Sequence, residues 1–248
     1  MDGILLVTGA GRGIGAATAT LAARRGYAVC VNYLHNQAAA MRVVDAIEHA
    51  GGHAIAVAAD ISVEAEVLRL YESIDRQWGP VTALVNNAGI LERQTRVQSI
   101  DAARLQRVFA TNVIGSFLCA REAVLRMSTA QGGQGGAIVN VSSVAAQTGS
   151  PNEYVEYAAS KGAIDSFTRG LAAEVAGEGI RVNAVRPGFI HTDMHASGGE
   201  PDRIERVKGL VPLGRGGRAE EVAAAILWLL SAEASYTTGA FIDVAGGR

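Results

Sequence analysis

The residues best suited to chemistry are a tyrosine and a lysine, Tyr157 and Lys161, four positions apart in a helical pattern. Residues at this spacing lie on one face of a helix. Only two of the 22 basic residues are lysines, so a lysine at this place is unusual for the chain. A free tyrosine has a pKa of about 10, and a neighbouring ammonium favours its phenolate form. We therefore expect Lys161 to lower the pKa of Tyr157, making it a proton shuttle near neutral pH.

Two further features bear on this shuttle. Tyr154 is a rival phenol, but the residue four positions later is Ala158, so we reject it as the acid. A carbonyl substrate needs a second hydrogen-bond donor for its oxygen. Ser142 and Ser143 follow a predicted strand and would place a hydroxyl at its carboxyl end. The residue types and positions leave either serine open for this role.

A glycine-rich turn predicts a dinucleotide site near the start of the chain. It lies between an apolar run at residues 4–8 and a helical pattern at 14–25. Glycines permit a tight turn here, and they let backbone N–H groups approach a pyrophosphate at the helix N-terminus. The residues that we expect to contact the cofactor in this turn are Gly9, Gly11, Arg12, Gly13, Ile14 and Gly15.

The end of the second predicted strand bears on the choice of cofactor. An NAD site usually has Asp or Glu about 20 residues after the glycine-rich turn, where it binds the ribose 2′-hydroxyl. The chain has Asn32 and Tyr33 there, and no acid before Asp45. Arg12 could pair with a 2′-phosphate through its forked donors. We therefore favour NADP(H), with NAD(H) possible, and expect Asn32 and Tyr33 to contact it.

The whole chain alternates short apolar runs with longer amphipathic segments. The runs mostly lack polar alternation, which indicates strands buried on both faces of a parallel sheet. We predict an α/β protein, a doubly wound Rossmann fold in which helices flank seven parallel strands, as one domain over residues 1–248. The segment 191–217 is long and rich in Gly and Pro, which is typical of a substrate lid. The predicted strands are 4–8, 28–32, 54–58, 83–86, 137–141, 181–185 and 240–244; the helices are 14–25, 37–50, 64–78, 101–127, 157–176 and 219–230.

Composition limits the classes of partner, the cellular location and the metal sites that we expect. The net charge of −2 argues against nucleic acid or an anionic membrane as the main partner, because both need a basic surface. The two cysteines, Cys30 and Cys119, lie far apart without metal-site spacing, so we expect a reduced, cytoplasmic location. His191 and His195 lack an acidic or cysteine partner at ligand spacing, so we predict no metal site.

Several motifs in the same order resemble the classical short-chain dehydrogenase/reductase family. They are the Gly-x-x-x-Gly-x-Gly turn, Asn86-Asn87-Ala88-Gly89, Tyr-x-x-x-Lys and Pro187-Gly188. The likeness is nearest to the branch with 3-oxoacyl-carrier-protein reductases and glucose 1-dehydrogenase-like enzymes. In that family, a basic residue at the position of Arg12 goes with NADP. The resemblance implies catalytic roles for Asn112, Ser143, Tyr157 and Lys161, and cofactor contacts from Tyr157 and Lys161 as well as from Asp60, Ile61, Asn86, Ala88, Gly89, Pro187, Gly188, Ile190 and Thr192.

The resemblance also implies particular roles. Asn112 would interrupt its helix and hold a water linked to the lysine, and Thr192 would contact the nicotinamide amide. Family members are commonly homotetramers. Carrier-protein reductases typically have basic residues near the ends of two helices, whereas this chain has neutral residues and Glu178 there. That difference argues against docking of an acidic carrier protein.

The function that we predict is NADP(H)-dependent hydride transfer between nicotinamide and a carbonyl or alcohol of a small-molecule substrate. The catalytic groups would be Ser143, Tyr157, Lys161 and Asn112. One alternative is a glucose 1-dehydrogenase-like sugar dehydrogenase, which the polar lid would suit. An alternative of another class is a redox sensor that binds dinucleotide without catalysis. Such proteins typically lose the tyrosine or the lysine, and this chain has both.

Overall fold

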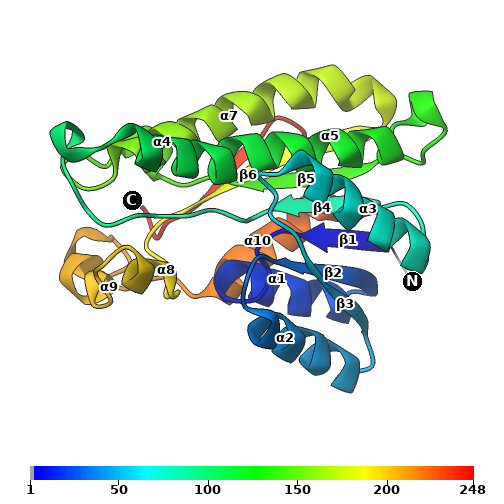
Figure 1. Cartoon of the computed structure of the whole chain (residues 1–248), viewed down its shortest axis with the longest axis horizontal. Helices are drawn as coiled ribbons and strands as arrows, with labels where there is room; N and C mark the ends of the chain where they lie inside the picture. Colours follow the sequence, from blue (N-terminus) through cyan, green and yellow to red (C-terminus); the bar gives the residue numbers. More distant parts are fainter. Residues whose placement is uncertain (1–2) are drawn as a thin grey trace.

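The computed structural model describes residues 3–248 and contains a seven-stranded parallel sheet with helices on both faces (Figure 1). The strand order is β3-β2-β1-β4-β5-β6-β7, which confirms the predicted fold class. The strands are β1 (Gly3–Val7), β2 (Tyr27–Tyr33), β3 (His53–Ala58), β4 (Ala83–Asn86), β5 (Gly136–Val141), β6 (Ile180–Pro187) and β7 (Phe241–Val244).

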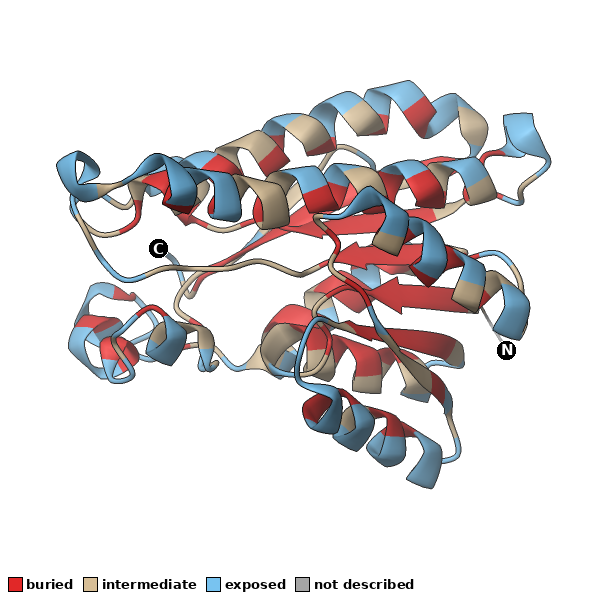
Figure 2. Ribbon diagram, in the orientation of Figure 1, coloured by how far each residue is buried: buried red, intermediate tan, exposed pale blue. Residues whose placement is uncertain are grey.

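The strands are apolar because helices cover both faces of the sheet. The central strands are buried along nearly all of their length (Figure 2). Successive side chains of a strand point to opposite faces. In β1, Leu5 and Val7 therefore join a core with α1 (Gly13–Arg24), α2 (Gln37–His49) and α10 (Ala219–Leu230). Leu6 joins the opposite core with α3 (Glu64–Trp78), α5 (Gly115–Met127) and α7 (Val155–Val175).

The long helix predicted at 101–127 is divided into three parts. It consists of α4 (Ala102–Phe109), a π-helical turn (Ala110–Ile114) and α5. Asn112 lies in the π turn, so the helix is interrupted at the residue where the family resemblance implied it. Such turns are frequent at functional sites, because the extra residue redirects a side chain. The remaining short helices are α6 (Ala145–Thr148), α8 (Met194–Ser197) and α9 (Arg203–Val207).

The stretch Ala102–Met127 is long and apolar enough to cross a membrane by length and composition alone. Its residues Cys119, Ala120, Ala123 and Met127 are buried in the core on one face of the sheet. This packing gives the apolar stretch a place inside the fold. Other residues of the same helix are exposed, among them Ile114 and Phe117.

The strand order reverses direction between β1 and β4, which are neighbours in the sheet. In doubly wound sheets, ligands bind outside the carboxyl ends of the strands at such a point. The glycine-rich turn follows β1, and the Asn86–Gly89 motif begins at the end of β4. The predicted lid, with α8 and α9, lies beyond the same edge of the sheet (Figure 1). The fold therefore gathers the motifs of the sequence at one edge.

Candidate active site

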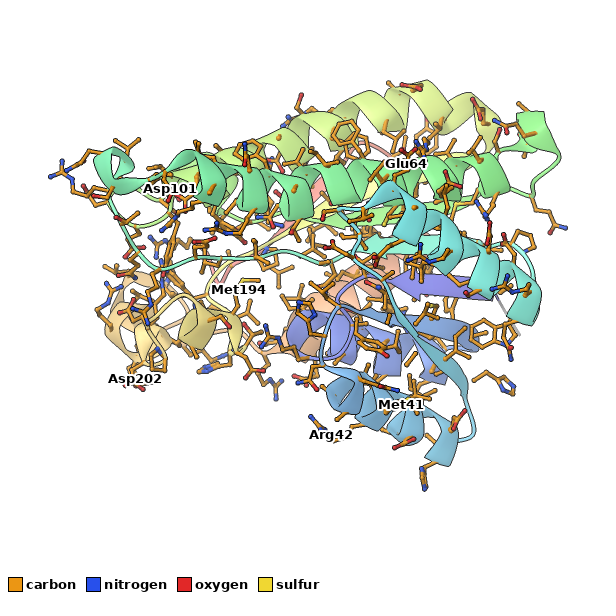
Figure 3. All side chains as sticks on the ribbon, viewed as in Figure 1. Met41, Arg42, Glu64, Asp101, Met194 and Asp202 are labelled. Atoms are coloured by element: carbon orange, nitrogen blue, oxygen red, sulfur yellow. The ribbon has the colours of Figure 1, made fainter. Side chains whose placement is uncertain are left out.

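A cavity of about 280 Å³ lies between the lid and the carboxyl ends of β5 and β6. Both Ser143 and Tyr157 line it, so a substrate there meets two hydroxyl groups. The wall is otherwise mixed, with aromatic, aliphatic and charged side chains. Residues of the lid that close it include Met194, which Figure 3 labels together with Asp202 near the start of α9.

Tyr157 lies in the first turn of α7 and is partly buried. A buried ion pair between Glu156 and Arg104 of α4 fixes the start of this helix. Burial raises the pKa of Tyr157 to about 12, while a hydrogen bond with Ser143 and the charge of Arg203 act in the opposite direction. The phenol is therefore protonated at neutral pH and can donate a proton to an oxygen in the cavity.

The expectation that Lys161 lowers the pKa of Tyr157 is wrong for this structure. The Lys161 ammonium donates a hydrogen bond to the Val141 carbonyl, 2.8 Å away, and lies 5.6 Å from the centre of the Tyr157 ring. It is buried, and burial lowers its pKa to about 8, with the charge of Asp165 opposing this. Desolvation of the phenol outweighs the effect of neighbouring cations. The spacing of four residues places the two side chains together, but it does not determine the sign of the pKa shift.

The structure separates the two candidate serines. Ser142 is buried, and its hydroxyl donates to Asp165 at 2.6 Å and to the Lys161 carbonyl at 3.2 Å. Ser143 is partly exposed, and its hydroxyl lines the cavity and accepts a bond from the Ala145 amide. Ser142 therefore holds β5 to α7, whereas Ser143 is the serine that a substrate can reach.

Asn112 supports the site from behind. Its amide oxygen accepts from the Ile90 N–H at 2.8 Å, and its amide nitrogen donates to the Ile90 carbonyl at 3.1 Å and to the Ser160 hydroxyl at 3.0 Å. Both amide hydrogens are thus used by protein groups. The expected role in holding a water would fall to the oxygen, so the structure shows Asn112 as a positioning residue that links the π turn, α7 and the segment after β4.

The glycine-rich turn is shaped to leave room for a ligand. Gly9 and Gly13 have positive φ angles of 61° and 56°, which favour glycine. A Cβ on Gly15 would come within 2.5 Å of the Asn87 amide nitrogen and 2.7 Å of the Gly9 carbonyl oxygen. The first turn of α1 contains no acidic residue, so its N–H groups suit an anion such as a pyrophosphate.

The motif after β4 holds this turn in place. The Asn87 side chain donates to the carbonyl oxygens of Thr8 at 2.8 Å and of Gly9 at 3.2 Å. Asn87 lies inside a motif recognised in the sequence but is not among the residues predicted to form the site. Its neighbour Asn86 is buried and donates to Asn140 and to the Ser116 carbonyl, so it braces the sheet. A Cβ on Gly89 would lie 3.4 Å from Asn112 and 3.5 Å from the Lys161 ammonium, which joins the two motifs.

The residues predicted to contact the cofactor ribose differ in how far their side chains are buried. Asn32 is buried, and its side chain accepts from the Gly9 N–H at 3.2 Å and donates to the carbonyls of Val57 and Ala59. Its side chain therefore supports the glycine-rich turn, and its contact with the cofactor stays a prediction. Tyr33 is partly buried at the end of β2. Arg12 is exposed at the N-cap of α1, and its side chain makes no hydrogen bond or ion pair within residues 3–248.

The other predicted cofactor contacts lie around the same edge. Asp60 is held by Ser62, whose N–H and hydroxyl donate to it at 2.9 and 2.7 Å. Ile61 is buried against the π-turn region, within 2.7 Å of a Cβ placed on Gly115. Thr192 approaches the glycine-rich turn, 3.2 Å from a Cβ placed on Gly13. Pro187, Gly188 and Ile190 lead from β6 to this point.

His191 and His195 lie at the start of the lid. Within residues 3–248, no group of three or more His, Cys, Asp or Glu side chains is arranged to hold a metal ion. The His195 ring bonds the Ile190 carbonyl at 3.0 Å. Phe189 and the lid residue Arg203 also line the cavity, and no motif in the sequence marks either of them as a substrate contact.

Comparisons of sequence and structure match this chain to known oxidoreductases. The profile of a family described as "Enoyl-(Acyl carrier protein) reductase" matches residues 9–248. An uncharacterized oxidoreductase of Escherichia coli, YgfF, is 61% identical over 99% of both chains. A 3-oxoacyl-[acyl-carrier-protein] reductase of Synechocystis is 40% identical over 98% of this chain and 96% of its own.

The structural comparison agrees. A crystal structure of a 3-ketoacyl-(acyl-carrier-protein) reductase from Brucella melitensis, complexed with NADH, has a TM-score of 0.92 at 34% identity, over 100% of this chain and 98% of that one. The fold and site thus define an NAD(P)-dependent oxidoreductase. The chain belongs to the short-chain dehydrogenase/reductase family, near its 3-oxoacyl-carrier-protein reductase branch. The resemblance and the enzyme class predicted from the sequence are confirmed.

The shape of the turn leads to a test by substitution. Gly15→Ala should abolish cofactor binding, because the added methyl group would collide with Asn87 and the Gly9 carbonyl. Gly170→Ala is the matched control, because nothing lies within 4 Å of a Cβ at that helical position. Titration of NADPH and NADH by fluorescence measures the effect. Equal affinity in the two variants would contradict this account of the turn.

Proposed function

We propose that this enzyme reduces a carbonyl group of a small-molecule substrate with NADPH. The observation that supports this most is the shared cavity of Ser143 and Tyr157, beside the motifs that form the dinucleotide site. The raised pKa of Tyr157 favours reduction, because a protonated phenol is the acid that a developing alkoxide needs.

Each residue has a separate task in this mechanism. A bound nicotinamide dinucleotide supplies the hydride. Ser143 and Tyr157 donate hydrogen bonds to the carbonyl oxygen, which orients the substrate and stabilises negative charge there. Tyr157 then gives its proton to that oxygen. Lys161 lies behind the Tyr157 ring, where its ammonium is held by a hydrogen bond to the Val141 carbonyl. Asn112 holds α7 and the segment after β4 in register.

The preference for NADP(H) rests on Arg12. Its guanidinium is exposed next to the glycine-rich turn and has no partner within residues 3–248. A 2′-phosphate would provide that partner through charge-assisted hydrogen bonds. The carboxylate that usually selects NAD is missing from the end of β2.

Arg12→Gln tests this preference. We expect the KM for NADPH to rise roughly 10- to 100-fold, from loss of charge-assisted hydrogen bonds, while the KM for NADH stays near that of the parent. Arg24→Gln, at the other end of α1, is the control, because Arg24 is also exposed and lies far from the glycine-rich turn. Steady-state kinetics with both cofactors decide the matter. An equal effect on the two would mean that Arg12 does not read the phosphate.

Removal of one hydroxyl tests the proton donor. Tyr157→Phe should lower kcat at least 100-fold, in the range of general-acid contributions, because no other phenol in this site is paired with a lysine. NADPH affinity should change little, as measured by fluorescence titration. Tyr154→Phe is the comparison, and we expect it to keep measurable turnover because Tyr154 donates to the Gly198 carbonyl. Full activity of Tyr157→Phe would refute the assignment.

We also propose that the enzyme is a homotetramer, as the family resemblance implies. The π turn and α5 expose three large apolar residues, Ile114, Phe117 and Leu125. The Phe117 ring stacks on the Phe167 ring of α7, with the ring centres 3.7 Å apart. An uncovered apolar surface of this kind is typical of subunit contacts. Phe117→Glu should therefore reduce the mass measured by light scattering after size-exclusion chromatography. A monomeric parent protein would contradict the proposal.

We propose a cytoplasmic location. Cys30 and Cys119 are both free and buried, and burial raises the pKa of each thiol, so neither is poised for disulfide formation. A chain that folds without disulfides suits a reducing compartment.

A further inference from the structure

The wall of the active-site cavity carries more positive than negative side chains. Three arginines line it, Arg203, Arg206 and Arg248, against one carboxylate, Glu153. An uncharged substrate would offer no charge to pair with a guanidinium group in this cavity. Arg206 and Arg203 differ in how many of their donors are already used.

Arg206 is already satisfied. Its side chain pairs with Glu200, and it also reaches Glu153 at 3.2 Å. Glu200 in turn accepts from Gln94. The Arg206 side chain is half exposed, which lets solvent screen its charge. The Arg206 guanidinium is thus paired with Glu200 in the lid and with Glu153 just before α7.

Arg203 is different, because it is buried and its side chain has a single ion-pair partner, Glu153. Only 6% of this residue is exposed. Its guanidinium lies 4.7 Å from the centre of the Tyr154 ring and 5.4 Å from that of Phe189, so two aromatic rings orient it. One of its nitrogens pairs with Glu153. Within residues 3–248, Nε is buried without a hydrogen-bond partner and no bond is made by Nη1.

The charge of Arg203 acts on the reacting centre. It is one of the groups that lower the pKa of Tyr157, and it also opposes protonation of His195. The pKa of His195 is lowered chiefly by burial, so this cavity residue is neutral near pH 7 and adds no competing charge. Glu153 is the one carboxylate on the wall, and Arg203 and Arg206 share it.

We propose that Arg203 binds an anionic carboxylate of the substrate, while Ser143 and Tyr157 hold its carbonyl oxygen. The substrate class is then an oxo acid, and the lid arginine selects it over neutral ketones and sugars. This inference rests on the proposed carbonyl reduction. A guanidinium suits a carboxylate because its planar donors match the two oxygens, and a buried, pre-oriented one loses little entropy on binding.

Matched pairs of compounds test the charge directly. Acetoacetate and levulinate carry the carbonyl at two distances from the carboxylate, and their methyl esters keep the shape without the charge. We expect kcat/KM with NADPH to be roughly 10- to 100-fold higher for at least one acid than for its ester. This comparison uses the unaltered protein and does not depend on the folding of any variant.

Two variants assign the effect to Arg203. Arg203→Gln should remove the preference for the acid, so that kcat/KM becomes similar for each acid and its ester. Arg203→Lys should restore part of the preference, because it keeps the charge without the planar fork. Arg69→Gln, an exposed residue of α3 outside the cavity, is the control and should keep the full preference.

The outcomes separate the two proposals. Ester turnover equal to acid turnover, or a preference that survives Arg203→Gln, overturns the anion site and leaves carbonyl reduction standing. If none of the four compounds is reduced, the proposed reduction fails for them, and saturation-transfer NMR of the acids and esters with the NADPH complex tests the anion site alone. Binding of an acid but not its ester, lost in Arg203→Gln, supports it, and any other binding result overturns it.

Discussion

The parallel pairing of β1 with β4 is the constraint on which the rest of this structure depends. Because the chain leaves these neighbouring strands in opposite directions along the sheet, their carboxyl ends are open to a ligand. The glycine-rich turn and the Asn86–Gly89 motif occupy these two ends, and Asn87 joins them by bonds to Thr8 and Gly9. A dinucleotide site follows from that junction, since backbone N–H groups and open space meet there.

The catalytic side chains depend on burial as much as on one another. Tyr157 and Lys161 share a face of α7, where Lys161 is buried and Tyr157 is partly buried. Desolvation acts against each charged form, which raises the pKa of the phenol and lowers that of the ammonium. The pair is therefore a protonated Tyr157 phenol beside a Lys161 ammonium whose pKa is lowered. This state suits proton donation to a carbonyl oxygen.

The lid contributes charged side chains to the active-site cavity. The framework of sheet, glycine-rich turn and α7 is shared with reductases that match over nearly the whole chain. The segment after β6 adds part of the cavity wall, with the Arg203 guanidinium near the rings of Tyr154 and Phe189. Loops placed on a rigid scaffold commonly carry the residues that contact a substrate.

The sequence by itself determined the fold class, the order of the strands along the chain and the family, because continuous apolar runs, glycine spacing and Tyr-x-x-x-Lys are local patterns. It also located the π interruption at Asn112, through the family resemblance. Only the tertiary structure decided which serine faces the substrate, since Ser142 and Ser143 are adjacent and differ only in which face of the strand end they occupy. Likewise, Asn32 and Asn86 have side chains of the expected type, yet long-range hydrogen bonds use them to brace the sheet. The sign of the pKa shift of Tyr157 and the place of Arg203 in the cavity also depend on burial by distant segments, and a local pattern carries no information about such burial.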